Sequence, residues 1–316
     1  MLSYISAGSN VDDKDFGLPT TEGLCVFMEK VKVGVFKCGN IGASPLFELL
    51  LDELADRRDI ETRTVTTGSK MGVEDVEEAL PKFFGFNLDL LVFISPNPSI
   101  SGPAKVRKEL SNSGVPCVVI SDAPGKRIKA ELEKQGLGYI VITGDPLIGA
   151  RREFLDPVEM AIFNSNIIKV LAITGVYRMV HQEIDKLIHA VRMGLRPVLP
   201  RLIIDVNSIR DNSSFGNPYA KAKAIAAYEL AEKIAEINIQ ACFIEKESDK
   251  YIPLVACAHE IAQIAAKLAE EAREIEKYSD TLVRKPHSKD GKLKIKTKLM
   301  LPPTLDEKFY RKLLKK

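Results

Sequence analysis

The stretch VKVGVFKCGNIGASPLFELLLDELADR, residues 31–57, indicates the fold of the chain. It opens with an apolar, β-branched run and passes through two glycines, Gly39 and Gly42, into a segment whose apolar residues recur at helical spacing. A buried strand that leads through a glycine turn into a helix is the repeating unit of parallel α/β sheets. The stretch therefore predicts that such a sheet begins at Val31.

Four more apolar runs continue this alternation. They span residues 61–67, 88–95, 116–121 and 139–143, with further helices expected near 73–84, 104–113 and 126–136. Five strands alternating with four helices are typical of a doubly wound, mainly parallel sheet, and continuous apolar strands indicate burial on both faces. We predict a five-stranded, Rossmann-like α/β domain over residues 30–148.

The rest of the chain divides into three predicted parts. Residues 149–283 form a helical second subdomain, with short strands expected at 202–206 and 242–246. Residues 1–29 lack helical or strand periodicity and are predicted to be a disordered extension. Residues 284–316 form a basic C-terminal tail with short extended segments, which we expect to be strands.

The net charge of +2 conceals two oppositely charged parts. Residues 284–316 carry twelve basic and three acidic residues, or +9, whereas the rest carries 33 basic and 40 acidic residues, or −7. A basic tail can bind nucleic acid non-specifically and in a salt-dependent manner, or steer anionic ligands. Because the body is acidic and interleaved aromatic residues are lacking, we do not expect nucleic acid to be the main partner.

The cysteines indicate a reducing compartment. Their number is odd, their spacings are wide and no CxxC occurs, which favours free thiols over a disulfide framework or a zinc site; they are Cys25, Cys38, Cys117, Cys242 and Cys257. The N-terminus lacks the basic start and apolar run of a secretory signal, and no run approaches the ~20 apolar residues of a membrane span. We therefore predict a cytoplasmic protein without membrane association.

Ligands of doubly wound sheets bind outside the carboxyl ends of the strands, and the unusual residues of this sequence lie there. The strand ends read Lys37-Cys38-Gly39-Asn40-Ile41-Gly42, Ser95-Pro96-Asn97-Pro98, Ser121-Asp122-Ala123-Pro124-Gly125 and Thr143-Gly144-Asp145-Pro146. We predict a small-molecule site built from these turns.

Each turn also has a purely structural interpretation. Gly39 and Gly42 allow an anion to approach backbone N–H groups at a helix N-terminus, or they only make a tight βα turn. Asn97 is held between prolines with its donor and acceptor exposed, or the prolines only mark the entry to a helix. Asp122 is a carboxylate at the mouth of the sheet, or it caps the following helix.

Neither a nicotinamide cofactor nor a metal is predicted. The turn is GxxG rather than GxGxxG, and no acidic residue follows the second strand, where an adenosine ribose would be held. HExxH is absent, and metal-like spacing is missing between the four histidines, His181, His189, His259 and His287. A lone helical histidine such as His259 is more often packed or solvated than functional.

The junction of the two predicted domains is crowded with charges. The segment GDPLIGARREFLDP, residues 144–157, carries Asp145, Arg151, Arg152, Glu153 and Asp156. Arginines at such a junction suit phosphate or carboxylate groups, but the same charges could form an interdomain ion-pair network. From the residues alone, the chain is an α/β protein with a small-molecule site at its strand ends and undetermined chemistry.

Several long segments resemble one known family. They are VGVFKCGNIGASPLFELLLDELADR, FISPNP, SGPAKVRKEL, SDAPGKRIKAELEKQGLGYI, DPLIGARREFLDPVEMAIFN, NPYAKAKAIAAYELA and IPLVACAHE. Together they resemble the coenzyme F420-dependent methylenetetrahydromethanopterin dehydrogenases of methanogenic archaea. The resemblance covers about Val31 to Gly291. The extension before Met28 and the basic stretch after about Lys292 are not recognised as family features.

The resemblance implies a reversible hydride transfer from the methylene carbon of methylene-tetrahydromethanopterin to the deazaflavin ring of oxidised coenzyme F420, which acts as a co-substrate. The product is the methenyl cation, and the step belongs to one-carbon metabolism and methanogenesis. The resemblance also implies a homo-oligomer that needs no metal, flavin or NAD. The alternative class is a nicotinamide-dependent dehydrogenase.

The resemblance and the strand-end positions together give roles to individual residues. Asp122, Asp145 and Glu153, with Asp156 as a further candidate, are expected near the methenyl cation, because fixed carboxylates favour a developing positive charge. The remaining candidates are expected to bind the ligands, which carry phosphate and carboxylate groups; they are Lys37, Cys38, Gly39, Asn40, Gly42, Ser95, Pro96, Asn97, Ala123, Pro124, Arg151, Arg152 and His259. An acid–base dyad is not expected, because proton transfer to the reacting carbon is not part of the step.

Overall fold

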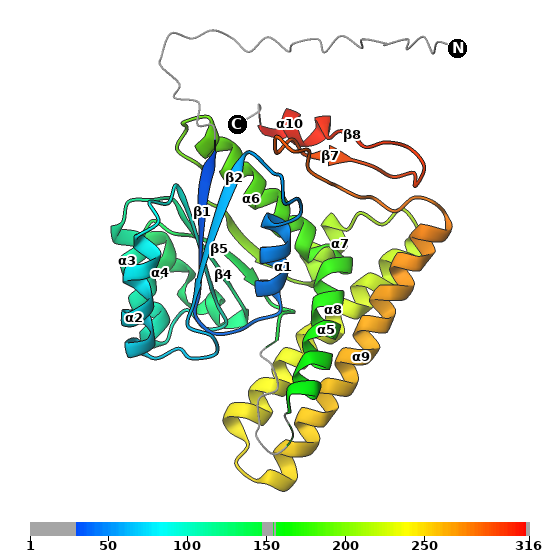
Figure 1. The fold of residues 1–316 in the computed structure, drawn as a ribbon. Coiled ribbons are helices and arrows are strands. Elements are labelled where there is room, and N and C mark those ends of the chain that lie inside the picture. Colours follow the sequence, from blue (N-terminus) through cyan, green and yellow to red (C-terminus); the bar gives the residue numbers. More distant parts are fainter. Residues whose placement is uncertain (1–29, 147–153, 155, 314–316) are drawn as a thin grey trace, which may run out of the picture.

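The computed structural model describes residues 30–146, 154 and 156–313, and its centre is a parallel six-stranded sheet in the order β2-β1-β3-β4-β5-β6 (Figure 1). The strands are β1 (Val31–Lys37), β2 (Ile60–Thr66), β3 (Leu90–Ser95), β4 (Cys117–Ser121), β5 (Gly138–Ile142) and β6 (Arg201–Ile204). From β1 the strands run outward to β2 on one side and to β3 on the other, so the sheet is doubly wound. The predicted α/β fold class is confirmed.

The sheet has one strand more than the five predicted. Residues 201–204, expected as a strand of the second subdomain, pair in parallel with β5, with Tyr139 opposite Arg201 and Ile142 opposite Ile204. Apolar patterning predicts that a strand exists but not which neighbour it pairs with. Here the chain crosses two long helices before it returns to the sheet.

Helices cover both faces of the sheet. Those of the α/β part are α1 (Ala43–Leu51), α2 (Val73–Phe84), α3 (Ser101–Asn112), α4 (Lys129–Lys134), α6 (Val176–Arg192) and α7 (Val206–Asn212), with a 3₁₀ turn, η1 (Ala123–Ile128), before α4. Val33 and Val35 of β1 share a core with α1 and α6, whereas Phe36 shares a second core with α2 and α3. Alternate side chains of a strand point to opposite faces, so β1 is buried on both.

Three long helices, α5 (Pro157–Thr174), α8 (Pro218–Ile239) and α9 (Ser248–Tyr278), form an arm beside the sheet (Figure 1). Small residues line the contact between them. Ala227 and Ala231 of α8 are fully buried in one cluster with Ala265 and Ala269 of α9. Alanine leaves little side-chain volume between two helix backbones, so the helices of the arm pack closely.

Among the described residues, α9 is long and apolar enough to cross a membrane, and α5 and α6 pass the same test only as a pair bent by 68°. The buried positions of α9 recur every three or four residues from Tyr251 to Glu276. They pack against α8 and α5, and a helix with one buried face is an ordinary core helix.

Residues 242–246, predicted to be a strand, are not one. They overlap a π-helical turn, η2 (Gln240–Ile244), that continues α8. Ala241 of this turn is buried in a cluster with Tyr251 and Val255 of α9. Periodicity cannot distinguish a strand from a helical segment in so short an apolar run, and packing against α9 determines the outcome here.

The basic segment folds onto the body as far as the structure describes it. β7 (Lys294–Ile295) pairs antiparallel with β8 (Thr304–Leu305), and α10 (Glu307–Leu313) follows. The N–H of Arg58 donates to the carbonyl of Lys289 at 2.8 Å, immediately before β2. This C-terminal module, residues 284–313, therefore lies at the amino ends of the strands, opposite the predicted ligand site (Figure 1).

Candidate active site

The carboxyl ends of four neighbouring strands bring the predicted turns to one edge of the sheet. Lys37 of β1 lies opposite Ile94 of β3, and Ser95 of β3 lies opposite Ser121 of β4. The N–H of Cys38 then donates to the carbonyl of Ile94 at 2.9 Å, which joins the first two turns directly. This edge is the candidate active site.

The glycine turn packs tightly against the turn after β3. Gly39 has φ of +87°, a conformation that side chains other than glycine rarely adopt. A Cβ at this position would lie 2.6 Å from Met71 Sδ and 2.8 Å from Pro96 Cδ. Pro96, predicted as a ligand residue, thus also holds the glycine turn in place.

Asp145, which follows β5, holds the start of α1 in place. Its Oδ1 accepts the N–H of Gly42 and its Oδ2 accepts the N–H of Ala43, both at 2.8 Å, and its side chain is fully buried. Burial raises the pKa of this carboxyl to about 7 despite the two hydrogen bonds. Asp145 therefore anchors the glycine turn and places a titratable charge beneath it.

The expected anion site at the glycine turn is not open. The N–H of Gly39 donates to the carbonyl of Gly68 at 3.1 Å, and the N–H of Gly42 donates to Asp145. We expected these N–H groups to meet the negative charges of a ligand, but the protein itself occupies both. A carboxylate more than a hundred residues away provides this partner, which the local GxxG pattern cannot reveal.

Asp122 is the second buried carboxylate of this edge. It is 3% exposed, and it accepts the N–H of Ala123 at the start of η1, so the capping interpretation is correct. Burial, together with the negative charge of Asp145, raises the pKa of Asp122 well above its ordinary value. Two carboxyl groups that share a site in this way do not both ionise readily, and a cation beside them would favour their charged forms.

Four other predicted residues have mixed surroundings. Lys37 Nζ forms an ion pair of 3.0 Å with Glu48 Oε1. Cys38 is buried, and this burial raises the pKa of its thiol. Asn97 Oδ1 accepts the N–H of Ser99 at 3.2 Å, and Asn40 is exposed.

Buried hydroxyl groups mark the same edge. The Oγ atoms of Ser95 and Ser121, which lie opposite each other on β3 and β4, are buried and have no hydrogen-bond partner among the described residues. The same holds for the Oγ of Ser44 on α1. A buried polar group without a partner is costly. These hydroxyls are therefore candidates for contacts with a bound ligand. The sequence placed Ser95 and Ser121 at the strand ends but gave a ligand-binding role only to Ser95.

His259 approaches the site from the arm. Its ring packs against Phe154 and Phe163, with centroids 4.8 and 4.6 Å away, and its Nδ1 lies 3.5 Å from Glu159 Oε2. In the part of the chain that the structure describes, neither ring nitrogen has a hydrogen-bond partner, and burial lowers the pKa of the imidazole. Phe163 belongs to the same core as Ile41 of the glycine turn, which connects His259 to the edge.

The charged junction is only partly visible. Arg151, Arg152 and Glu153 lie outside the described residues. Asp156 accepts the N–H of Glu159 at 2.7 Å and caps α5, so its carboxylate has a structural task.

Sequence reasoning missed the polar cluster at the end of β5. The Thr143 hydroxyl donates to Glu232 of α8, and Tyr228 Oη donates to the carbonyl of Ile204 at 2.7 Å while accepting the N–H of Gly144 at 3.0 Å. Burial raises the pKa of the half-buried Glu232. Tyr228 and Glu232 do not stand out in the Ala-rich helix, because only the fold brings α8 to this edge.

The sequence model of the methylene-5,6,7,8-tetrahydromethanopterin dehydrogenase family matches residues 31–304. The chain belongs to this family. The match to the methylenetetrahydromethanopterin dehydrogenase family extends past Gly291, the end of the segments that carry the resemblance, and includes β7. The assignment of the basic stretch after Lys292 to a region outside the family was therefore wrong up to residue 304.

Relatives within the family are close over most of the chain. The F420-dependent methylenetetrahydromethanopterin dehydrogenases of Methanothermobacter thermautotrophicus and Methanocaldococcus jannaschii are 54% and 53% identical, over 86% of this chain and 99% of each relative. A solved structure of an F420-dependent methylene-tetrahydromethanopterin dehydrogenase, in complex with methylene-tetrahydromethanopterin and coenzyme F420, matches with a TM-score of 0.84 at 47% identity. The structural match covers 86% of this chain and 99% of the chain in the solved structure.

Proposed function

We propose that this protein is an F420-dependent methylenetetrahydromethanopterin dehydrogenase. It transfers a hydride reversibly from methylene-tetrahydromethanopterin to oxidised coenzyme F420 and yields the methenyl cation and reduced F420. The observation that carries this conclusion is the TM-score of 0.84 with the complex that contains both ligands, over 86% of the chain. F420 acts as a co-substrate, and the nicotinamide alternative has no support from the glycine turn.

The candidate site suits direct hydride transfer. The reaction requires two carbon atoms held about 3–3.5 Å apart in a fixed orientation, which is a positioning task. The rigid turns at Gly39 and Pro96 can provide such a frame. We propose that the two buried carboxyl groups of Asp122 and Asp145, in their ionised forms, favour the positive charge as it develops. We assign Asp145 a positioning role, because both its oxygens are held by α1.

The anionic groups of the ligands need cations at the same edge. Lys37 is available only in competition with Glu48. Lys126 and Arg127 of η1 are exposed and follow Asp122 by four and five residues. We propose these two side chains as further contacts for ligand phosphate or carboxylate groups, in addition to Arg151 and Arg152, which were proposed from the sequence.

The activity is tested by mixing methylene-tetrahydromethanopterin and oxidised F420 with the purified protein and following the loss of deazaflavin absorbance. Turnover should require both ligands, and NADP at the same concentration should not replace F420. Absence of turnover with F420, or equal turnover with NADP, would contradict the proposal.

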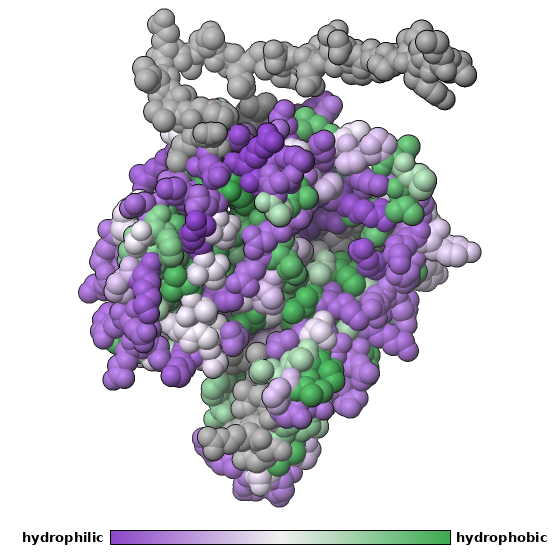
Figure 2. All heavy atoms as spheres, viewed as in Figure 1, coloured by the Kyte–Doolittle hydropathy of each residue, from purple (hydrophilic) through white to green (hydrophobic). Residues whose placement is uncertain are grey.

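We also propose that the protein is a cytoplasmic homo-oligomer. Large hydrophobic side chains are exposed on the arm, among them Val158 and Ile162 of α5, Phe243 of η2 and Ile264 of α9, each at least half exposed. Figure 2 shows hydrophobic side chains on the lower part of this arm. Extensive exposed apolar surface is typical of protein interfaces. Light scattering should give a multiple of 35.0 kDa, and a single-chain mass at micromolar concentration would contradict it.

Part of the basic segment already has partners within the chain. Lys285 Nζ pairs with Asp306 Oδ2 at 2.6 Å, and Lys289 Nζ pairs with Asp56 Oδ2 at 2.5 Å. The first pair lies within the C-terminal module, and the second supports a role of this module's lysines in attaching it to the body. We propose that any binding to nucleic acid is non-specific and salt-dependent.

A further inference from the structure

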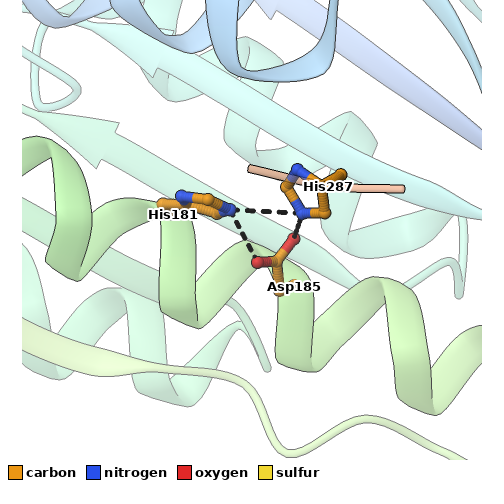
Figure 3. Close-up of side chains that lie close together, drawn as sticks. All are labelled: His181, Asp185 and His287. Carbon is orange, nitrogen blue, oxygen red and sulfur yellow. Dashed lines mark hydrogen bonds and ion pairs between the residues drawn. The ribbon is translucent and has the colours of Figure 1, made fainter. Parts of the chain in front are cut away.

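Three buried side chains lie close together, as Figure 3 shows, and none of them belongs to the candidate active site. His181 and Asp185 lie one turn apart on α6, and His287 comes from the C-terminal module. His287 Nε2 lies 3.2 Å from His181 Nε2 and 3.0 Å from Asp185 Oδ1. His181 Nε2 lies 2.8 Å from Asp185 Oδ2. Each side chain is at least nine-tenths buried.

The three donor atoms surround one point. With protons on both Nε2 atoms, His181 and His287 each donate to one oxygen of Asp185, and the two nitrogens lie 3.2 Å apart. A single cation that contacts both Nε2 lone pairs and the carboxylate would take the place of these two protons.

Glu53 orients the His287 ring toward the cluster. Its Oε2 lies 2.7 Å from His287 Nδ1, and its Oε1 accepts the backbone N–H of His287 at 3.1 Å. A proton on Nδ1 leaves the lone pair of Nε2 free to face the cluster. Carboxylates orient metal-binding histidines in this way, with the second ring nitrogen donating to the carboxylate.

The spacing of the donor atoms fits a single ion. Donors about 2.1 Å from a Zn²⁺ ion, at angles between octahedral and tetrahedral, lie about 3.0–3.4 Å from one another, close to the 2.8–3.2 Å found here. A cavity of about 30 Å³ borders Asp185, which is room for a water as a further ligand. The cation Arg57, which lines the same cavity, is already paired with Asp59 at 2.7 Å.

We propose that His181, Asp185 and His287 bind one divalent transition-metal ion, with Zn²⁺ as the representative. Two neutral imidazoles and one carboxylate are a donor set for such ions. With Glu53, a divalent ion makes the buried cluster neutral. The ion would attach the C-terminal module to α6 and to the end of α1, so its role is structural and separate from hydride transfer.

The proposal is tested on the full-length protein after removal of metal with a chelator. Zn²⁺ is returned by equilibrium dialysis, and the bound metal is counted by mass spectrometry. We expect one zinc per chain. At a free zinc concentration a hundredfold above Kd, binding stabilises the fold by about 2.7 kcal/mol, which raises the Tm by about 4 °C for a chain of this size.

Two ligand variants and one matched control make the test specific. His287→Gln and Asp185→Asn should each weaken zinc binding about 100-fold or more, since loss of even an outer partner costs 10–100-fold. His189→Gln, on the same helix but outside the cluster, should retain one zinc per chain. Because the site lies away from the active edge, F420 reduction at 25 °C should not change when zinc is removed.

The visible spectrum of the Co²⁺-substituted protein identifies the ligands independently of any variant. Nitrogen and oxygen donors without a thiolate charge-transfer band are expected. A thiolate band would place the metal on a cysteine and overturn the proposal, and so would less than stoichiometric zinc in the wild type. Full zinc occupancy in both Asp185→Asn and His287→Gln would do the same. If His287→Gln does not fold, the wild-type stoichiometry and spectrum decide the question with Asp185→Asn.

Discussion

Asp145 shows how one buried residue can combine structure and chemistry. It holds the N–H groups of Gly42 and Ala43, and its charge lies below the edge where the ligands are proposed to bind. Asp145→Asn keeps the size but replaces one acceptor with a donor that faces an N–H group. We predict a decrease in kcat/KM of about 100-fold at pH 8, the range found when one preorganised electrostatic partner is lost. Asp211→Asn, at an exposed position, is the control and should retain wild-type activity.

The raised pKa of Asp145 gives a dependence on pH with a definite sign. Its carboxyl titrates at about 7 in the fold and at about 3.8 in the unfolded chain, so between these values the native state holds more protons. The contribution of this group to stability is therefore full below pH 4 and is lost as the pH rises to 7. Urea unfolding should show that wild type loses stability relative to Asp145→Asn between pH 5 and pH 8. A wild type that gains stability relative to Asp145→Asn as the pH rises would contradict the assignment.

Activity should change in the opposite direction. Ionised Asp145 favours the methenyl cation, whereas the protonated form does not. We therefore predict that kcat/KM for methylene oxidation rises with an apparent pKa near 7 and that this rise is absent in Asp145→Asn.

A comparison of alanine substitutions at Gly39 and Gly68 distinguishes the cost of crowding from the cost of backbone strain. Both have positive φ, +87° and +65°, but a Cβ at Gly39 would collide with Met71 and Pro96, whereas the space around Gly68 is open. Gly39→Ala should therefore destabilise the fold by about 1–3 kcal/mol more than Gly68→Ala, because only the first adds overpacking to the strain. Urea unfolding of both variants measures the difference, and equal losses would contradict the account.

At the scale of elements, local sequence patterns predicted which turns meet at the carboxyl edge of the sheet. They did not predict the side-chain contacts between segments that are distant in the sequence. The apolar runs and glycine turn near Val31 fix strand, turn and helix in one segment, and parallel pairing then brings the strand ends together. The contact of Asp145 with Gly42 spans 103 residues, and that of His181 with His287 spans 106. Neither leaves a sign in local spacing, and Glu232 is hidden in the same way on α8.

The arm depends on small residues between α8 and α9. Ala227 is fully buried in the cluster with Ala265, whereas its neighbour Ala226 is exposed. Ala227→Leu inserts three carbons into a filled contact and should cost about 1–3 kcal/mol in the free energy of unfolding. Ala226→Leu should change it by less than about 0.5 kcal/mol. Similar effects of the two variants in denaturant would contradict the close packing of the arm.

At the scale of the whole molecule, the net charge of +2 describes neither part of the chain. The acidic body carries the sheet and the candidate active site at its carboxyl edge. The basic segment, up to Leu313, folds over the amino edge, where its Lys289 pairs with Asp56 of the body. The two ends of the sheet thus have different tasks, hydride transfer at one and attachment of the C-terminal module at the other.

The central claim is that the hydride passes directly between the two ligands held at the carboxyl edge. It is tested most directly with methylene-tetrahydromethanopterin that carries deuterium at the methylene carbon, in ordinary water, with one turnover to oxidised F420. We predict that one deuterium appears on the deazaflavin ring of the reduced F420, as measured by mass spectrometry. Deuterium released to water, with unlabelled reduced F420, would contradict direct transfer and with it this account of the site.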